Sequence, residues 1–181
     1  MYRKKIRELV VNINPFDQLE RKHQEDTIEW IDSGAPLCRI QKPSTPPKHL
    51  VSYFVLVDLD KEMLLLVDHK KALLWLPSGG HVEPNEDPTD TAHRELNEEL
   101  NVALPLWQPT PLFLTVTETV GKTAGHIDVS LWYVYTADST THLSYDTEEF
   151  HEIRWFPISD LPLSRSDPHL SRFRDKLGRT K

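Results

Sequence analysis

The middle of the chain has a pattern of apolar residues that predicts a β-sheet. Residues 50–57 are apolar on both alternations except at Ser52, which is the pattern of a strand covered on both faces. Other short segments are rich in β-branched and aromatic residues and are bounded by turn-forming residues. We therefore expect further strands at 63–67, 112–120, 127–136 and 152–156, while residues 73–77 lead into Ser78, Gly79 and Gly80.

Helices are expected near both ends of the chain. Residues 14–32 predict an N-terminal helix, with Pro15 in its first turn and a stop at Ser33 and Gly34. Its apolar contacts are expected from Leu19, Ile28, Trp30 and Ile31. Residues 168–178 predict a short helix, and residues 41–48, with three prolines, an extended linker.

A third helix is predicted after Asp87. Asp87 is a suitable N-cap, Pro88 fits the first turn, and Asp90 lies near the positive end of the helix dipole. Apolar residues recur four positions apart and form a stripe that can dock on a sheet; they are Ala92, Leu96 and Leu100.

Strands interrupted by one strong helix, with more helices at the ends, indicate an α/β or α+β fold with a mixed sheet. We divide the chain at the proline-rich linker. Residues 1–42 are then an N-terminal helical extension, and residues 43–181 form the main domain.

Composition narrows the class of protein. The 181 residues have a net charge of −7 and no basic patch, which argues against a binder of polymeric nucleic acid or of an anionic membrane. Cys38 is the only cysteine, so an intramolecular disulfide is impossible, and we expect it to be a small buried residue. The basic start has no apolar segment after it, and no apolar run is long enough to span a bilayer. We expect a cytoplasmic protein.

The helix after Asp87 also has a stripe of carboxylates. Glu95, Glu98 and Glu99 are three and four residues apart, so they project from one face and repel one another. A hard divalent cation would offset this repulsion, and oxygen-only ligation suits Mg²⁺ or Mn²⁺. Arg94 lies four residues before Glu98 and can pair with it.

The segment from Gly80 to Val102 resembles the signature of the Nudix hydrolases, G-x5-E-x7-R-E-U-x-E-E-x-G-U, where U is apolar. Each fixed position matches except one, because Asn101 replaces the last glycine. Asn is tolerated in the left-handed conformation that ends helices. The resemblance implies a Nudix-type α/β/α sandwich with a mixed sheet, over roughly residues 50–163.

The resemblance also implies roles for individual residues. Glu95, Glu98 and Glu99 match metal ligands, and Arg94 matches an arginine that orients a catalytic glutamate. The resemblance also implies that one of these three glutamates can take the proton of the attacking water, with Glu95 and Glu98 as catalytic candidates.

Neighbouring loops supply the remaining candidates. Gly79 matches a residue whose backbone carbonyl completes the metal coordination, and Gly80 and His81 are expected to contact substrate. His81 can equally be an ordinary neutral loop histidine. Glu149, just before the last strand, is a further candidate base, although loop carboxylates are often only solvated. Glu86 is expected to support the site without binding metal.

The expected activity is Mg²⁺- or Mn²⁺-dependent hydrolysis of a nucleoside diphosphate linked to another group, or of a related diphosphate. One alternative is an isomerase of the isopentenyl-diphosphate type, which shares the fold but uses a cysteine in the core. Another is a non-catalytic nucleotide-sensing module, which would be free to lose its carboxylates. The expected partner is a small diphosphate, and a homodimer is compatible with the family.

Overall fold

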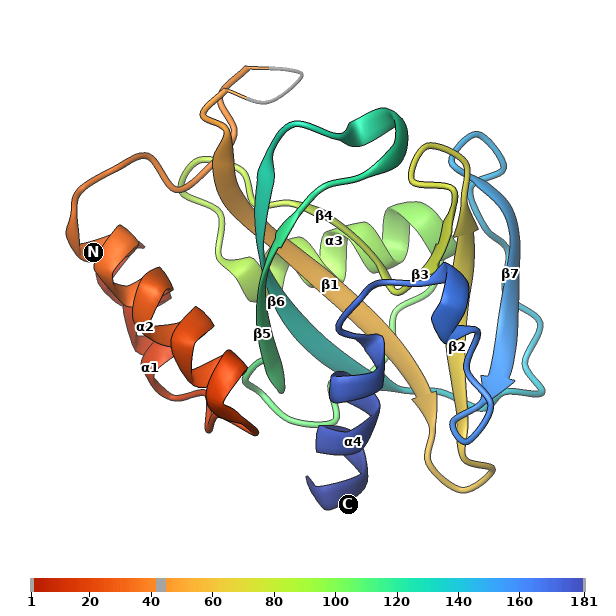
Figure 1. The fold of residues 1–181 in the computed structure, drawn as a ribbon. Coiled ribbons are helices and arrows are strands. Elements are labelled where there is room, and N and C mark those ends of the chain that lie inside the picture. Colours follow the sequence, from red (N-terminus) through yellow and green to blue (C-terminus); the bar gives the residue numbers. More distant parts are fainter. Residues whose placement is uncertain (1, 42–44, 181) are drawn as a thin grey trace.

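The computed structural model describes residues 2–41 and 45–180, in which four α-helices surround a seven-stranded mixed sheet (Figure 1). The helices are α1 (Tyr2–Val11), α2 (Gln18–Asp32), α3 (Pro88–Leu100) and α4 (Leu170–Thr180). The strands are β1 (Lys48–Asp58), β2 (Met63–His69), β3 (Leu74–Leu76), β4 (Ser78–His81), β5 (Phe113–Glu118), β6 (Ile127–Thr136) and β7 (Phe150–Pro157). Two short 3₁₀ turns lie at Gly121–Thr123 and Leu163–Arg165.

The long strand β1 organises the sheet. The strand order is β3-β2-β1-β6-β5, with β4 also paired to β1 and β7 to β2. β1 and β6 run parallel, in a register that extends from the Lys48–Ile127 pair to the Val57–Thr136 pair. The other pairings are antiparallel.

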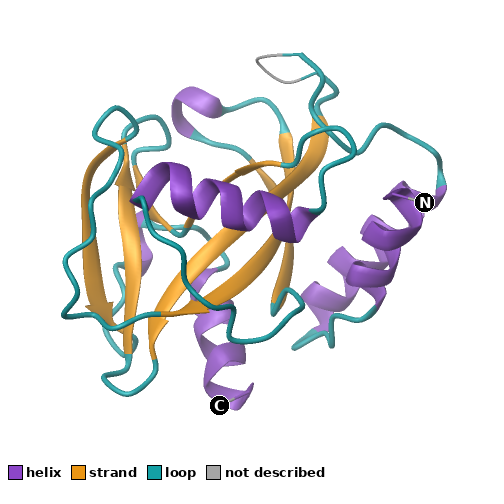
Figure 2. Ribbon diagram, turned by 180° about the vertical axis from the view of Figure 1, so that it is seen from behind, coloured by secondary structure: helices purple, strands orange, loops and turns teal. Residues whose placement is uncertain are grey.

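Helices cover both faces of this sheet. On β1, Phe54 and Leu56 pack in one core cluster and Val55 and Val57 in the other, as alternation along a strand requires. The first cluster contains the predicted stripe of α3, and the second contains buried residues of α4. Figure 2 shows α3 lying across its face of the sheet. The α/β/α sandwich with a mixed sheet is therefore confirmed.

The two N-terminal helices pack against the β5 side of the sheet and share the core cluster of α3. One link between α2 and α4 is a buried ion pair, in which Lys176 Nζ donates to Glu20 Oε1 at 2.7 Å. The same Glu20 oxygen accepts the backbone N–H of Leu114 on β5 at 3.2 Å. The boundary between residues 42 and 43 lies outside the described residues, so the division into extension and main domain stays a prediction.

The N-terminal region differs from the prediction in two respects. α1 was not expected, and α2 begins at Gln18 rather than near Pro15, because the side chain of Asp17 caps it by accepting from Glu20 N at 2.8 Å. The expected contact of Leu19 is also wrong, since Leu19 is 42% exposed. The buried positions of α2 are Glu20, His23, Thr27 and Ile31. Three of these four are polar, which hides the helical period from an analysis of apolar residues.

The remaining elements match the prediction with shifted ends. The strand expected at 112–120 spans Phe113–Glu118, and β7 begins two residues earlier than expected. β3 and β4 were not predicted as strands of their own. Residues 42–44 of the expected linker lie outside the described residues. Among the residues that the structure describes, no helix has the length and apolar character needed to cross a membrane.

Candidate active site

Helix α3 is built by its local sequence as predicted. Asp87 caps its start, with the side chain accepting from Thr89 N at 2.9 Å, and Pro88 is the first helical residue. Asn101 ends it in the left-handed conformation, at φ 50° and ψ 42°. Because Ala92, Leu96 and Leu100 are buried against the sheet, the carboxylate stripe is directed along the side of the helix.

Arg94 links the carboxylates of this segment, but its main partners are not the expected one. Its guanidinium donates to Glu86 at 2.8 and 3.0 Å and to Glu95 at 2.6 Å. The expected pair with Glu98 is present at a longer 3.3 Å. Burial of Glu86 opposes its ionisation, yet bonds from Arg94, the Glu83 N–H and Thr91 outweigh it and lower the Glu86 pKa to about 2. Glu86 is thus an ionised anchor for Arg94.

Glu95 and Glu99 are held in an environment that disfavours their charge. Burial raises the pKa of Glu99 to about 9, and the nearby carboxylates of Glu95, Glu149 and Asp146 add to this, against a hydrogen bond from Ser78. Burial also raises the pKa of Glu95, although Arg94 opposes the shift. Glu99 Oε2 is buried and has no hydrogen-bond partner among the described residues. Glu99 therefore lacks compensating positive charge, whereas Arg94 partly compensates that of Glu95.

The glycines of β4 allow the strand to approach α3 and β1 closely. A Cβ at Gly80 would overlap with the carboxylate of Glu95. Gly79 has a φ of +154°, and a Cβ there would overlap with the backbone carbonyl of Ser52 on β1. Gly79 therefore requires glycine for space and for its backbone conformation, whereas a side chain at position 80 would have to displace the carboxylate of Glu95.

Glu98 and Glu149, the other predicted carboxylates, differ in position. Glu149 lines the same cleft as Glu95 and Glu99, and its Oε1 lies 3.7 Å from Lys71 Nζ. The side chain of Glu98 is 57% exposed and is not among the residues that line this cleft. The structure therefore brings Glu95, Glu99 and Glu149 together, with Glu98 at the outer edge.

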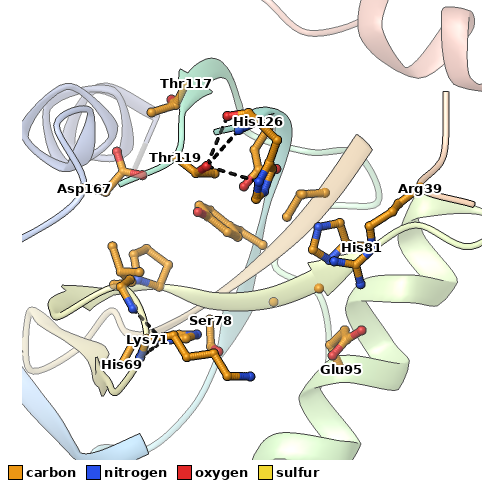
Figure 3. A pocket seen from close by; sticks show the side chains of 18 of the residues that line it. Arg39, His69, Lys71, Ser78, His81, Glu95, Thr117, Thr119, His126 and Asp167 are labelled. Atoms are coloured by element: carbon orange, nitrogen blue, oxygen red, sulfur yellow. Dashed lines mark hydrogen bonds and ion pairs between the residues drawn. The ribbon is translucent and has the colours of Figure 1, made fainter. Parts of the chain in front are cut away.

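Glu95, Glu99 and Glu149 line a cleft of about 850 Å³, part of which Figure 3 shows. Arg39, Lys71 and Lys122 line its walls and add positive charge. His81 also lines the cleft, and burial, followed by the charge of Arg39, lowers its pKa to about 3, so the ring is neutral.

Several cleft residues were not predicted from the sequence. Arg39 comes from the segment after α2, and His126 and Asp128 come from β6 and the residues just before it. The His126-x-Asp128 spacing was an available signal, because residues two apart on a strand face the same side. Nothing in the sequence indicates that Arg39 reaches this cleft.

The carboxylates fit a hard divalent cation. Glu99 has a buried oxygen without a partner in the described part of the chain, and Glu95 and Glu99 have raised pKa values, so a cation would supply the missing charge. Glu95, Glu98, Glu99 and the Gly79 carbonyl offer oxygen donors only, which is the donor set of Mg²⁺ or Mn²⁺.

Comparison with known proteins decides the family. The family model described as NUDIX domain matches residues 47–177. The chain belongs to the NUDIX domain family. This Nudix chain is 29% identical over 119 residues to a Bacillus subtilis (strain 168) protein named "Uncharacterized Nudix hydrolase YvcI", covering 63% of this chain and 72% of the relative. The predicted family and its class of enzyme, a Nudix hydrolase, are confirmed.

Solved structures share the Nudix fold. A NUDIX family hydrolase from Clostridium perfringens superimposes with a TM-score of 0.57 at 24% identity, covering 74% of this chain and 98% of that one. The C. elegans Ap4A hydrolase, solved as a binary complex, gives a TM-score of 0.61 at 18% identity, covering 72% and 96%. At these identities the likeness concerns the fold alone.

Proposed function

We propose that this Nudix hydrolase is a Mg²⁺- or Mn²⁺-dependent pyrophosphohydrolase that cleaves the diphosphate linkage of a nucleoside diphosphate derivative. One observation carries the proposal: the buried Glu99 carboxylate, whose Oε2 has no hydrogen-bond partner among the described residues, and the Glu95 carboxylate line one cleft with basic walls. Such a cleft can hold metal at one wall and phosphate at another.

The proposed ligands are Glu95, Glu98, Glu99 and the backbone carbonyl of Gly79. When bound, a divalent ion would neutralise phosphate charge and lower the pKa of an attacking water. Arg94 holds Glu95 and Glu98 in position by donating to both, and Glu86 fixes Arg94 from the other side. Placement of this kind avoids reorganisation during the reaction.

Proton transfer is assigned to a glutamate of the cleft. Glu149 lies near both Glu95 and Glu99 and lines the cleft, so we propose it as the base that accepts the proton of the water, with Glu95 or Glu98 as the alternative. General-base catalysis of this kind typically contributes about 10² to 10⁴ in rate.

The substrate is proposed to bind along the basic walls. Arg39, Lys71 and Lys122 attract phosphates electrostatically, and Gly80 and His81 line the same cleft as Glu95. A volume of about 850 Å³ falls within the range of pockets for nucleotide-sized ligands. Polymeric nucleic acid is not the proposed partner, because the net charge is −7.

The isomerase alternative loses support from the position of Cys38. Its Sγ lies 2.9 Å from the Tyr2 hydroxyl and contacts the Glu83 carbonyl, and Cys38 is not among the residues that line the cleft. Burial raises the pKa of this thiol, which disfavours the reactive thiolate.

A panel of nucleotide and sugar-nucleotide diphosphates, assayed with Mg²⁺ and with Mn²⁺ for released phosphate or monophosphate, tests the proposal. We expect turnover of at least one substrate that depends on the added metal. In ¹⁸O-labelled water, a single turnover with excess enzyme should place one label on one product phosphate, because water attacks phosphorus directly.

Variants assign this activity to the carboxylates. Glu98→Gln and Glu99→Gln should abolish metal-dependent turnover, whereas the control Glu25→Gln, at an exposed position of α2, should retain it. Full activity of both cleft variants at saturating Mg²⁺ would refute the proposed metal site. Failure to cleave any diphosphate in the panel would favour the sensing module.

A further inference from the structure

A cluster of three histidines and one aspartate lies beside the carboxylate site. His49, His81, His126 and Asp128 each offer a ligand atom, and these four atoms all lie within 4.8 Å of one another. The sheet brings them together, because His49 on β1 is the register partner of Asp128 on β6, while β4, which ends at His81, pairs with β1 on its other edge.

The potential ligand atoms of this cluster lack ordinary hydrogen bonds. His49 Nε2, His81 Nε2 and Asp128 Oδ1 are buried, and none has a hydrogen-bond partner in the described part of the chain. Asp128 Oδ1 lies 3.3 Å from Nε2 of His49 and 3.3 Å from Nε2 of His126. Buried polar atoms without partners lower the stability of the fold. A bound ligand would remove this cost by contacting them.

In two of the rings, His49 and His126, the second nitrogen, Nδ1, contacts a group outside the cluster. His49 Nδ1 lies 2.9 Å from the Pro46 carbonyl, and because a carbonyl oxygen only accepts, Nδ1 bears the proton. In this tautomer the lone pair is on Nε2, which lies 3.3 Å from Asp128 Oδ1 within the cluster. His126 Nδ1 contacts the Thr119 hydroxyl at 3.2 Å. Metal-binding histidines typically have their second nitrogen fixed in this way.

We propose that His49, His81, His126 and Asp128 form a binding site for a transition-metal ion such as Zn²⁺, separate from the carboxylate site. Imidazole nitrogens suit Zn²⁺ and similar ions, whereas Mg²⁺ prefers oxygen ligands. Ligand atoms of a tetrahedral site with bonds of about 2.0–2.1 Å lie about 3.3 Å apart, as both pairs with Asp128 do. Other separations reach 4.8 Å, so a bound ion has to draw at least one ligand inward.

Two charged groups act on the cluster in opposite senses. The neutral imidazole ring is the form that binds metal. Asp128 supplies a negative charge. The positive charge of Arg39 lowers the pKa of both rings, His81 and His126, as burial does, and it opposes the binding of a cation.

The proposed ion would lie in the wall of the same cleft, because His81, His126 and Asp128 line it. Gly80 adjoins Glu95, and the next residue, His81, faces the other side of β4, as Figure 3 shows. The strand therefore separates the imidazole site from the carboxylate site.

Cobalt provides a direct spectroscopic test. The full chain, stripped of metal with a chelator, is titrated with Co²⁺ in excess Mg²⁺, which fills the carboxylate site. We expect one equivalent of Co²⁺ to give the intense visible bands of a four-coordinate ion, and one equivalent of Zn²⁺ to abolish them. A spectrum of six-coordinate Co²⁺ only, or displacement by Mg²⁺, would overturn the proposal.

Variants locate the bound ion. Asp128→Asn and His126→Gln should each weaken Co²⁺ or Zn²⁺ binding at least about tenfold, with folding checked by circular dichroism. Either variant suffices if the other fails to fold. His142→Gln, at an exposed histidine, and Glu98→Gln should bind as the parent does. Unchanged affinity in a folded cluster variant, or loss of binding in Glu98→Gln, would show that the ion binds elsewhere.

Discussion

Gly80 lies directly against the carboxylate of Glu95, so that residue 80 has no room for a side chain. The atoms in the way are the far end of a flexible side chain and can move aside. An added methyl group therefore displaces the Glu95 carboxylate more readily than it disrupts the strand.

Gly80→Ala should accordingly leave the fold intact and lower metal-dependent turnover, by about a hundredfold if the carboxylate moves by about 1 Å. Kinetics and thermal melts of the purified variant measure the two effects separately. The matched control is Gly178→Ala in α4, where an added Cβ meets nothing within 4 Å and should slightly stabilise the helix. Full activity of Gly80→Ala would mean that the position of Glu95 does not matter.

Stability of the metal-free protein should fall as the pH rises. Burial raises the Glu99 pKa from 4.5 to about 9 in the folded chain, so between these values the unfolded chain has released a proton that the folded chain retains. The stability that Glu99 contributes is full below about pH 4.5 and is lost as the pH approaches 9, by up to about 1.4 kcal/mol per pH unit. Urea unfolding in chelator at pH 5, 7 and 9 measures it. In Glu99→Gln this decline should be smaller, and equal slopes in both proteins would contradict the assigned shift.

The end of α3 should tolerate glycine and reject a β-branched residue. Asn101 is left-handed, and its N–H bonds to the Asn97 carbonyl at 2.9 Å. Asn101→Gly should be neutral or mildly stabilising, whereas Asn101→Val should cost about 1 kcal/mol or more. Thermal melts of the pair decide this, and a Val variant as stable as the parent would contradict it.

Replacement of Lys176 should lower the free energy of unfolding, because its partner Glu20 is not accessible to water. Glu20 is fully buried, so Lys176→Met leaves an uncompensated charge and should cost about 3–5 kcal/mol in urea unfolding. The exposed pair of Lys22 and Asp26 provides the control, since Lys22→Met should change stability by less than about 1 kcal/mol. A similar small loss for both variants would show that Glu20 finds another partner.

Local signals made α3 predictable. The cap at Asp87, the apolar stripe and the left-handed Asn101 all depend on residues within a few positions of one another, and the structure has each of them. The family signature lies on the same helix, so the fold and the carboxylate stripe followed from one segment.

Contacts between distant segments could not be predicted in the same way. β4 contains two glycines and no apolar pattern, and it is a strand because β1 pairs with it. Arg94 was expected to hold Glu98, but the turn before α3 brings Glu86 to it. The meeting of His49 with Asp128 depends on the parallel register of β1 and β6, which periodicity does not specify.

The bond between Glu20 and Lys176 also bears on how such a chain changes over evolutionary time. The two residues are 156 positions apart, and each would be a buried, unpaired charge without the other. A lineage that replaced only one of the two residues by an apolar one would leave the other as a buried charge without its partner. The two helices that carry them, α2 and α4, are therefore expected to be inherited together, and chimaeras with other members of the family should exchange both or neither.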